Sequence, residues 1–414
     1  MSRAMRDSGI PWIGVMPENW KTEKFKHVFR IKKILAGKLG YDVLSVTQKG
    51  LKVKNIENNE GQIANDYSNY QLVFPNDFVM NHMDLLTGYV DVSKQEGVTS
   101  PDYRTFYAID IDNTYNQYYL HIFQFCYKTR LFYNLGQGVS QLGRWRLPAE
   151  QQNEFILPVP PISEQHRISD FLNKKCGEID EAIALQEEFI EELKSYKQSV
   201  ITEAVTRGLN PNVKLKDSGI DWIGKIPQGW EVIKVGFLFD NLDYLRQPIS
   251  AELRERNNPQ YDYYGASGVI DKIDHYNVEG KVLLIGEDGA NLVLRNLPLI
   301  YKAEGRFWVN NHAHILKPKD NNDYNYMAHA LEAANYRNYI TGSAQPKLSQ
   351  DNLQAVKLPV PPLTEQKQIA DYLDDKCTEI DGLIAIKQQK IEELKEYKKS
   401  IIYEYVTGKK EVDG

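Results

Sequence analysis

One stretch of the chain occurs twice, and this repeat constrains the fold more than any other feature. Leu157–Thr206 aligns with Leu358–Thr407 without a gap, and more than half of the aligned residues are identical. The two copies lie about 200 residues apart, whereas the repeats of a solenoid recur every 20–50 residues, roughly. The sequence therefore predicts a duplicated pair of domains.

Each copy carries the start signals of a long helix. Two prolines precede the helical pattern, and proline cannot continue a helix from upstream because it lacks an amide N–H. Ser163 offers an N-cap hydroxyl, and Glu164 lies in the first turn, where the helix dipole favours an acidic side chain. Thr364 and Glu365 occupy the same places in the second copy. We expect one long helix in each copy.

Apolar residues in both copies alternate steps of four and three, which is the a/d pattern of a coiled coil. The predicted seam consists of Leu172, Cys176, Ile179, Ile183, Ile190 and Leu193 in the first copy and Leu373, Cys377, Ile380, Ile384, Ile391 and Leu394 in the second. The natural partner of each helix is the other. Lys197 and Lys398 occupy equivalent seam positions, where they either fix the register or extend their ammonium groups to water.

A second, shorter repeat marks where each unit begins. Asp7–Gly14 matches Asp217–Gly224, and each peptide leads into a proline and a tryptophan. The repeating unit is therefore an entry peptide, a globular domain and a long helix. The predicted segments are globular domains at residues 1–156 and 211–357 and long helices at residues 157–210 and 358–414.

The two globular parts are much less alike than the helices, and both show mixed α/β patterns. Strand-like runs bounded by Gly, Asn and Asp occur at residues 77–80, 88–92, 281–285 and 306–309, and helices are predicted at 115–127 and 324–335. Since both helices must bury the same seam, the second should return antiparallel to the first. The predicted fold class is α+β, with two globular α/β domains joined by two long antiparallel coiled-coil helices in pseudo-two-fold symmetry.

Composition excludes some classes of protein. No run of about 18 apolar residues predicts a membrane span, and the N-terminus lacks the apolar core of a signal peptide. Three cysteines, two of them at one repeated seam position, suit buried thiols in a reducing compartment, so we expect a cytoplasmic protein. The net charge is −6, so a partner would have to supply much of any contact with DNA phosphates.

Two similar but divergent domains on a rigid spacer suit a linear ligand with two different half-sites, and duplex DNA is the obvious one. The doubled LPVPP-x-x-EQ helix start, the doubled DSGI-x-WIG peptide and the divergent domains resemble the specificity (S) subunit of type I restriction-modification systems. The resemblance covers essentially the whole chain.

This resemblance implies a concrete function. Each globular domain would be a target recognition domain that reads one half of a bipartite double-stranded DNA sequence, and the coiled coil would set the spacing. The coiled coil and the adjoining repeats would dock two methyltransferase (M) subunits, and motor-nuclease (R) subunits would complete the restriction complex. S-adenosylmethionine, ATP and Mg would bind to those partners, so the chain itself would be a non-catalytic subunit without a cofactor.

The motifs agree with a chain that carries no chemistry of its own. The sequence has no Walker A loop, no complete dinucleotide-binding fingerprint and no Asn/Asp-Pro-Pro-Tyr/Phe motif of adenine methyltransferases. Two alternatives stay open. One is a coiled-coil scaffold whose domains bind proteins rather than DNA, which the weak charge favours, and the other is a metal-dependent nuclease with a diffuse site.

Candidate DNA-reading residues stand in a polar segment just before each long helix. Arginine can pair with guanine and glutamine with adenine, while lysine and serine suit phosphates. The candidates are Gln141, Arg144 and Arg146 in the first domain and Gln345 and Lys347 in the second. The alternative is a solvated loop that only orients the helix.

Three further candidates lie elsewhere in the domains. Arg104 follows a turn, where phosphate contact and plain surface are both open. Asn311 and His312 precede His314, and the two imidazoles at i and i+2 would share one side of a strand. Structural hydrogen bonding, DNA contact and metal binding are open for this group, although no Cys or carboxylate pattern supports a metal. Glu287-Asp288 is interpreted as a turn rather than a catalytic pair.

Overall fold

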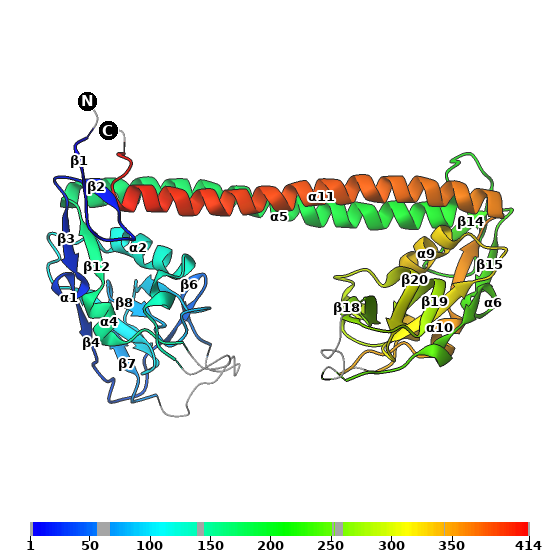
Figure 1. Ribbon diagram of the computed structural model, residues 1–414, viewed down its shortest axis with the longest axis horizontal. Helices are drawn as coiled ribbons and strands as arrows, with labels where there is room; N and C mark the ends of the chain where they lie inside the picture. The colour runs from blue at the N-terminus through cyan, green and yellow to red at the C-terminus, as the bar shows by residue number, and fades with distance from the viewer. Residues whose placement is uncertain are drawn as a thin grey trace. The chain divides into compact units, whose positions relative to one another are not determined.

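The computed structural model describes residues 3–55, 67–138, 145–250, 252, 260–342 and 344–412. The chain divides into two compact units, Met1–Gln186 with Gln389–Gly414 and Glu187–Gln388. Each unit contains one globular domain and part of both long helices (Figure 1). The predicted α+β class, with two mixed domains and two long paired helices, is confirmed. No helix among these described residues is long and apolar enough to cross a membrane.

The first globular domain contains two four-stranded sheets. Its fully antiparallel sheet has the order β4 (Phe29–Lys32), β11 (Arg104–Ala108), β8 (Phe78–Met80) and β9 (Val90–Val92). The other sheet has the order β6 (Gly50–Val53), β5 (Val43–Thr47), β10 (Gly97–Thr99) and β7 (Gln71–Val73), and its β10–β5 pair is parallel. The remaining elements are β1 (Met5–Asp7), β2 (Val15–Pro17), β3 (Lys21–Lys24), α1 (Phe25–Val28), α2 (Asn116–Lys128), α3 (Leu131–Asn134), α4 (Ala149–Glu154), β12 (Ile156–Val159) and the long helix α5 (Ile162–Arg207).

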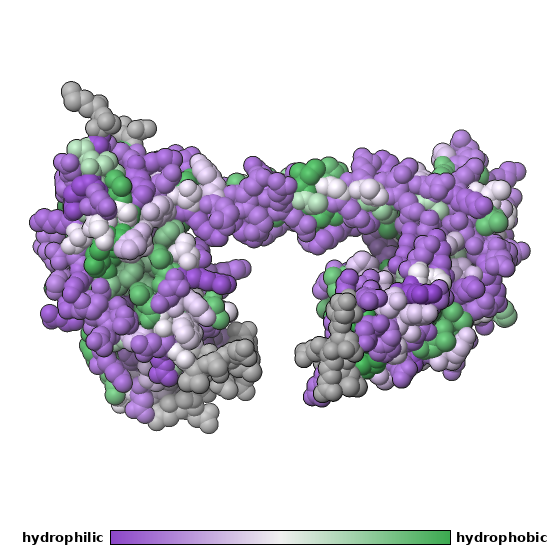
Figure 2. Space-filling model, viewed as in Figure 1, coloured by the Kyte–Doolittle hydropathy of each residue, from purple (hydrophilic) through white to green (hydrophobic). Residues whose placement is uncertain are grey.

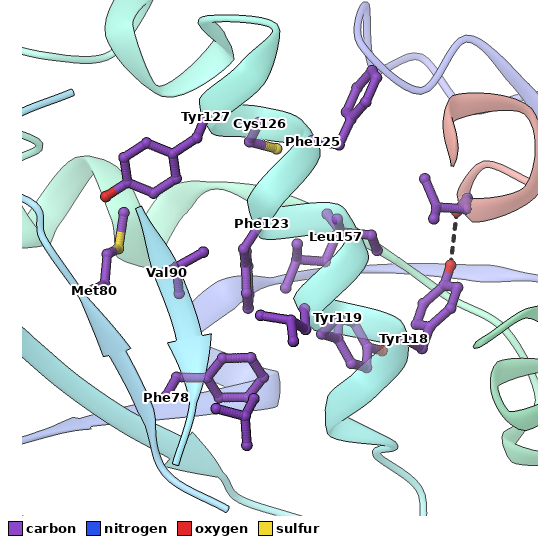
Figure 3. Packing of buried hydrophobic residues seen from close by; sticks show 14 of the residues in the cluster. Phe78, Met80, Val90, Tyr118, Tyr119, Phe123, Phe125, Cys126, Tyr127 and Leu157 are labelled. Carbon is purple, nitrogen blue, oxygen red and sulfur yellow. Dashed lines mark hydrogen bonds between the residues drawn. The ribbon is translucent and has the colours of Figure 1, made fainter. Parts of the chain in front are cut away.

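Helix α2 covers the antiparallel sheet with a cluster of aromatic rings (Figure 3). Phe123 of α2 meets Phe78 of β8 edge to face at 5.5 Å, and Phe78 stacks on Phe106 of β11 at 4.8 Å. The predicted helix at 115–127 and the predicted strands at 77–80 and 88–92 are confirmed as α2, β8 and β9. The core of the domain thus combines buried aromatic rings with aliphatic side chains such as Val79 and Val90.

The second domain has one six-stranded sheet. Its order is β16 (Phe239–Asn241), β21 (Ala313–Pro318), β19 (Val278–Gly286), β20 (Ile300–Val309), β17 (Tyr261–Gly265) and β18 (Gly268–Ile273), with only β17 and β20 parallel. The remaining elements are β13 (Leu215–Asp217), β14 (Lys225–Pro227), β15 (Glu231–Lys234), α6 (Val235–Leu238), η1 (Asp243–Leu245), α8 (Asn291–Leu294), α9 (Tyr324–Ala333), η2 (Arg337–Tyr339), α10 (Gln350–Ala355), β22 (Lys357–Val360) and the long helix α11 (Leu363–Val406). The predicted strands at 281–285 and 306–309 and the helix at 324–335 are confirmed as parts of β19, β20 and α9.

The strand orders show that the two domains share a frame. The first four strands of the six-stranded sheet, β16-β21-β19-β20, repeat the order β4-β11-β8-β9 when strands are matched by their place in the chain. In both domains a short helix, α4 or α10, and a strand, β12 or β22, then lead into the long helix. The unlike sequences therefore build equivalent elements before each repeated helix.

The repeated Glu-Gln pair at the helix start ties each long helix to its own globular domain. Glu164 accepts a hydrogen bond from the indole Nε1 of Trp20 at 3.0 Å. The side-chain oxygen of Gln165 accepts from the Tyr115 amide at 2.8 Å, and its Nε2 donates to the carbonyls of Asn113 and Pro160. These bonds join the tryptophan that follows the entry peptide, the start of α2 and the start of α5.

The second copy repeats these bonds. The Trp230 indole donates to Glu365 at 3.0 Å, Gln366 accepts from the Asp323 amide at 2.8 Å, and Gln366 donates to the Pro361 carbonyl. The prediction that Ser163 and Thr364 cap the helices is wrong, because α5 and α11 begin one residue earlier, at Ile162 and Leu363. In α5 the Pro161 carbonyl accepts the first-turn amides of Glu164 and Gln165.

Within each unit the two long helices pack antiparallel. In the first unit Phe171 packs against Tyr405 and Asp180 pairs with Lys398, so residue numbers fall along α11 as they increase along α5. In the second unit Lys387 lies over the Phe189 ring and Lys197 binds Asp381, with the same sense. All twelve predicted seam residues are buried or half-buried.

The two seam lysines and the cysteines have defined surroundings. The Lys398 ammonium lies 2.6 Å from Asp180, and the Lys197 ammonium lies 2.7 Å from Asp381, each on the opposite helix. This cross-helix pairing favours the interpretation that the lysines fix the register. The three cysteines are free and buried, and burial raises the pKa of each thiol.

Candidate nucleic-acid interface

In the first domain the segment before α4 is fixed by backbone hydrogen bonds. Gln137 and Arg146 exchange two amide–carbonyl bonds of 2.8 and 3.0 Å. The Leu147 amide then donates to the His82 carbonyl at 2.9 Å, and the Leu85 amide donates to the Trp145 carbonyl at 3.0 Å. We call residues 137–138 and 145–147 the first bridge segment.

The second domain repeats this arrangement before α10. Thr341 and Lys347 exchange two backbone bonds of 2.8 Å each. The Leu348 amide donates to the Glu287 carbonyl at 2.7 Å, and the Gly289 amide donates to the Pro346 carbonyl at 3.0 Å. We call residues 341–342 and 344–348 the second bridge segment.

The equivalence of these bonds places Arg146 and Lys347 at one shared position of the frame. Both side chains are exposed, and Gln345 is exposed next to Lys347. Gln141 and Arg144 lie outside the described residues. The exposed basic side chains fit contact with DNA, and the adjoining backbone bonds fit a loop that orients the helix.

In the second domain a network of ion pairs surrounds Lys347. Its ammonium lies 2.9 Å from the Glu287 carboxylate, whose other oxygen binds the Arg246 guanidinium. Arg246 also lies 3.3 Å from Asp243. Burial opposes ionisation of Glu287, but bonds to Lys347 and Arg246 hold its pKa below the usual value. The same bond to Glu287 raises the pKa of Lys347.

Asn311 and His312 lie at the same surface as this network. The Arg246 guanidinium reaches the Asn311 carbonyl at 3.4 Å, and His312 Nδ1 lies 2.7 Å from the Asp288 carboxylate. Both residues are exposed. The structure therefore brings Asn311, His312 and Lys347 to one surface of the second domain.

His314 differs from His312. It is fully buried, with Nδ1 at 2.6 Å from Asp243 and Nε2 at 2.8 Å from the Leu348 carbonyl. The prediction that both imidazoles lie on one side of a strand is wrong, because β21 begins only at Ala313. A structural hydrogen-bonding role is confirmed for the buried His314, whereas His312 binds Asp288 at the exposed surface.

Arg104 also differs from its prediction. The prediction that it lies at the surface is wrong, because β11 is an inner strand and the side chain is buried. Its guanidinium donates to Gln152 at 2.5 Å and to the Leu147 carbonyl at 3.1 Å. Burial lowers the pKa of Arg104 to about 10. The group thus supports the first bridge segment from inside the domain.

Three neighbours of the basic positions were missed or given little weight from sequence. Glu287 is interpreted from sequence as part of a turn, and His82 and Arg246 are not among the candidates predicted from sequence. The available signal was that His82 and Glu287 each follow a central strand closely, β8 and β19. In the described parts of the chain, no group of three or more His, Cys, Asp or Glu side chains is placed to hold a metal ion.

One family model matches two segments of this chain. The model, described as a type I restriction modification DNA specificity domain, matches residues 17–195 and 227–396. The chain belongs to the type I restriction-modification DNA specificity family. It is thus an S subunit, and the two matched copies coincide with the two repeated units of sequence.

Known proteins resemble the chain over different lengths. The putative type I restriction enzyme MjaX specificity subunit of Methanocaldococcus jannaschii is 24% identical over 96% of this chain and 95% of its own length. The putative specificity subunit S.HindORF215P of Haemophilus influenzae is 35% identical, but over only 31% of this chain and 32% of its own length.

A solved structure supports the fold. A chain from a study of complex assembly and conformational transition of the type I R-M system matches with a TM-score of 0.69 at 14% identity. The match covers 94% of this chain and 98% of that chain.

Proposed function

We propose that this S subunit reads a bipartite double-stranded DNA target, with one half-site for each globular domain. The observation that carries the proposal is the pair of equivalent bridge segments, which present Arg146 in one domain and Lys347 in the other on the same backbone frame. A shared frame with different exposed side chains suits two readers of different sequences. Gln345, Asn311 and His312 would add contacts in the second half-site.

The long helices would dock two M subunits. Two exposed apolar positions recur in both copies of the repeat: Leu185 with Ile386 and Tyr196 with Tyr397. At these positions each unit exposes one aliphatic and one tyrosine side chain, on helices whose visible surface is largely hydrophilic (Figure 2). Two equivalent apolar surfaces support the binding of two copies of one partner. R subunits would then join the M and S subunits.

The chain would act in the cytoplasm as a non-catalytic subunit. S-adenosylmethionine, ATP and Mg would bind to the M and R subunits. Family membership and the lack of methyltransferase and Walker motifs in the sequence support this division. If the isolated chain cleaved DNA with a metal ion, the division would be wrong.

Modified-base sequencing tests the proposal. The chain is expressed with its methyltransferase subunit in a host without DNA methylation. A two-part motif with a fixed gap and methyl-adenine in each half is the expected result. The scaffold alternative, which the net charge of −6 favours, predicts that both proteins copurify although no motif appears and no salt-sensitive DNA binding is found.

A further inference from the structure

In each domain one residue just after a central strand binds the bridge segment through its backbone carbonyl. His82 follows β8, and its carbonyl accepts the Leu147 amide. Glu287 follows β19, and its carbonyl accepts the Leu348 amide. The backbone role is the same in both domains, whereas one side chain is an imidazole and the other a carboxylate.

In the second domain the carboxylate holds the basic side chain in place. A lysine side chain is a point charge on a flexible stem, so its ammonium can reach many phosphate or base atoms. The bond from Lys347 to Glu287 at 2.9 Å restricts that choice. Glu287 is itself fixed by Arg246, and only 12% of its side chain is exposed. The ammonium of Lys347 is thus held by a group that cannot move freely.

The described residues of the first domain include no such carboxylate beside the basic side chain. His82 is half-buried, and its Nδ1 atom is buried without a hydrogen-bond partner among the described residues. Burial and the guanidiniums of Arg104 and Arg146 lower the pKa of His82 to about 4, so the imidazole is neutral at neutral pH. Within the described parts of the chain no carboxylate pairs with Arg146. An unpaired guanidinium keeps both donors for the O6 and N7 atoms of guanine.

We propose that Glu287 is a positioning residue that sets the base preference of Lys347 at one base pair of the second half-site. This inference rests on the proposed function. Glu287 orients the ammonium of Lys347 toward one base pair and keeps it from the phosphates, and its own negative charge repels a misplaced backbone.

The bipartite target supplies an internal control for the test. Glu287→Gln is expressed with the methyltransferase subunit in the methylation-free host, and both halves of the methylated motif are sequenced. We expect discrimination at one base pair of the second half-site to fall about tenfold, the size of one good base contact, while the first half-site stays unchanged. Glu279→Gln is the matched control, because Glu279 pairs with Arg306 on the exposed surface of the same domain.

A second variant is needed in case Glu287→Gln fails to fold. Lys347→Gln changes an exposed side chain and should alter the same base pair as Glu287→Gln. The inference is overturned if either variant gives a methylated motif with the same base preferences as the wild type at every position. It is also overturned if the two variants change the preference at different base pairs. If Glu287→Gln gives no methylation, Lys347→Gln alone decides. A wild-type chain that yields no bipartite motif would instead overturn the proposed function.

Discussion

Replacing Glu164 by glutamine should weaken the packing of the first entry peptide more than the same change at Glu365 weakens the second. Both carboxylates lie in the first turn of a long helix and accept an indole hydrogen bond at 3.0 Å, from Trp20 and Trp230. Glu164 also binds the Arg3 guanidinium at 2.7 Å. Among the residues with described positions, no arginine or lysine pairs with Glu365.

The size of the difference follows from the Arg3 ion pair, which the second copy does not share, since the weaker bond from Asn19 to Glu164 at 3.4 Å can persist with an amide oxygen. Glutamine keeps an oxygen for the indole, and the loss of a favourable charge near the helix N-terminus is the same in both copies. A hydrogen bond to a charged group contributes about 1.5–3 kcal/mol, against about 0.5–1.5 kcal/mol for a neutral one. We therefore expect Glu164→Gln to cost about 1 kcal/mol more than Glu365→Gln, which is about fivefold in a local opening equilibrium.

Hydrogen exchange followed by mass spectrometry measures this locally. Amides of the first entry region, such as those of Ser8 and Gly14, are protected by backbone bonds, and Ser218 and Gly224 make the same bonds in the second. The factor by which Glu164→Gln speeds exchange in the first region should be about five times the factor by which Glu365→Gln speeds exchange in the second region. Equal increases would show that Arg3 adds nothing and would refute the reasoning.

Four further results are expected. Tyr118→Phe should cost about 1–2 kcal/mol in urea unfolding, since the buried hydroxyl donates to the Val406 carbonyl at 2.7 Å; an unchanged midpoint would contradict this. Burial lowers the pKa of His121 from 6.5 to about 4, so the unfolded chain binds a proton that the folded chain excludes, and stability should fall as pH falls from 6.5 toward 4. His121→Gln should flatten this loss, and His27→Gln, at an exposed site, should not. Arg104→Met should lower stability by about 1–3 kcal/mol in thermal unfolding, because it leaves two buried acceptors unpaired, whereas a phosphate-contact role predicts weaker DNA binding at unchanged stability. Inserting one heptad into one long helix should change the gap between half-sites in the methylated motif, or abolish assembly, without changing either half-site; altered half-site bases would contradict the division between domains and spacer.

The repeated helices could be predicted from sequence because their signals are local. A heptad is written in neighbouring residues, so the seam from Leu172 to Leu193 needs no knowledge of the rest of the fold. The roles of the Glu-Gln pair could not be found in this way. Glu164 and Gln165 bind Trp20 and Tyr115, which are 144 and 50 residues away in the chain. From the local pattern alone, Glu164 could be interpreted only as an acidic residue that interacts favourably with the helix dipole.

The candidate site shows the same limit. The polar segments before the helices were found because they recur at one place in the repeat, and the structure gives both the same backbone bonds. Arg104 was misplaced because a turn and an arginine predict a surface, whereas β11 carries the side chain to Gln152 and Leu147. Glu287 was overlooked because its partners, Arg246 and Lys347, approach from segments 41 residues before it and 60 after it.

The distribution of these contacts explains how one frame can carry two different readers. The bonds that fix each bridge segment join backbone atoms or come from the buried side chains of Arg104 and His314, so they do not depend on which side chains stand at positions 82, 146, 287 and 347. The bonds that fix each domain to its helix use side chains that recur in both copies, Glu164 with Glu365 and Gln165 with Gln366. Substitutions at the reading positions therefore need not disturb the docking of a domain on its helix, and base preference can change while the spacing stays fixed.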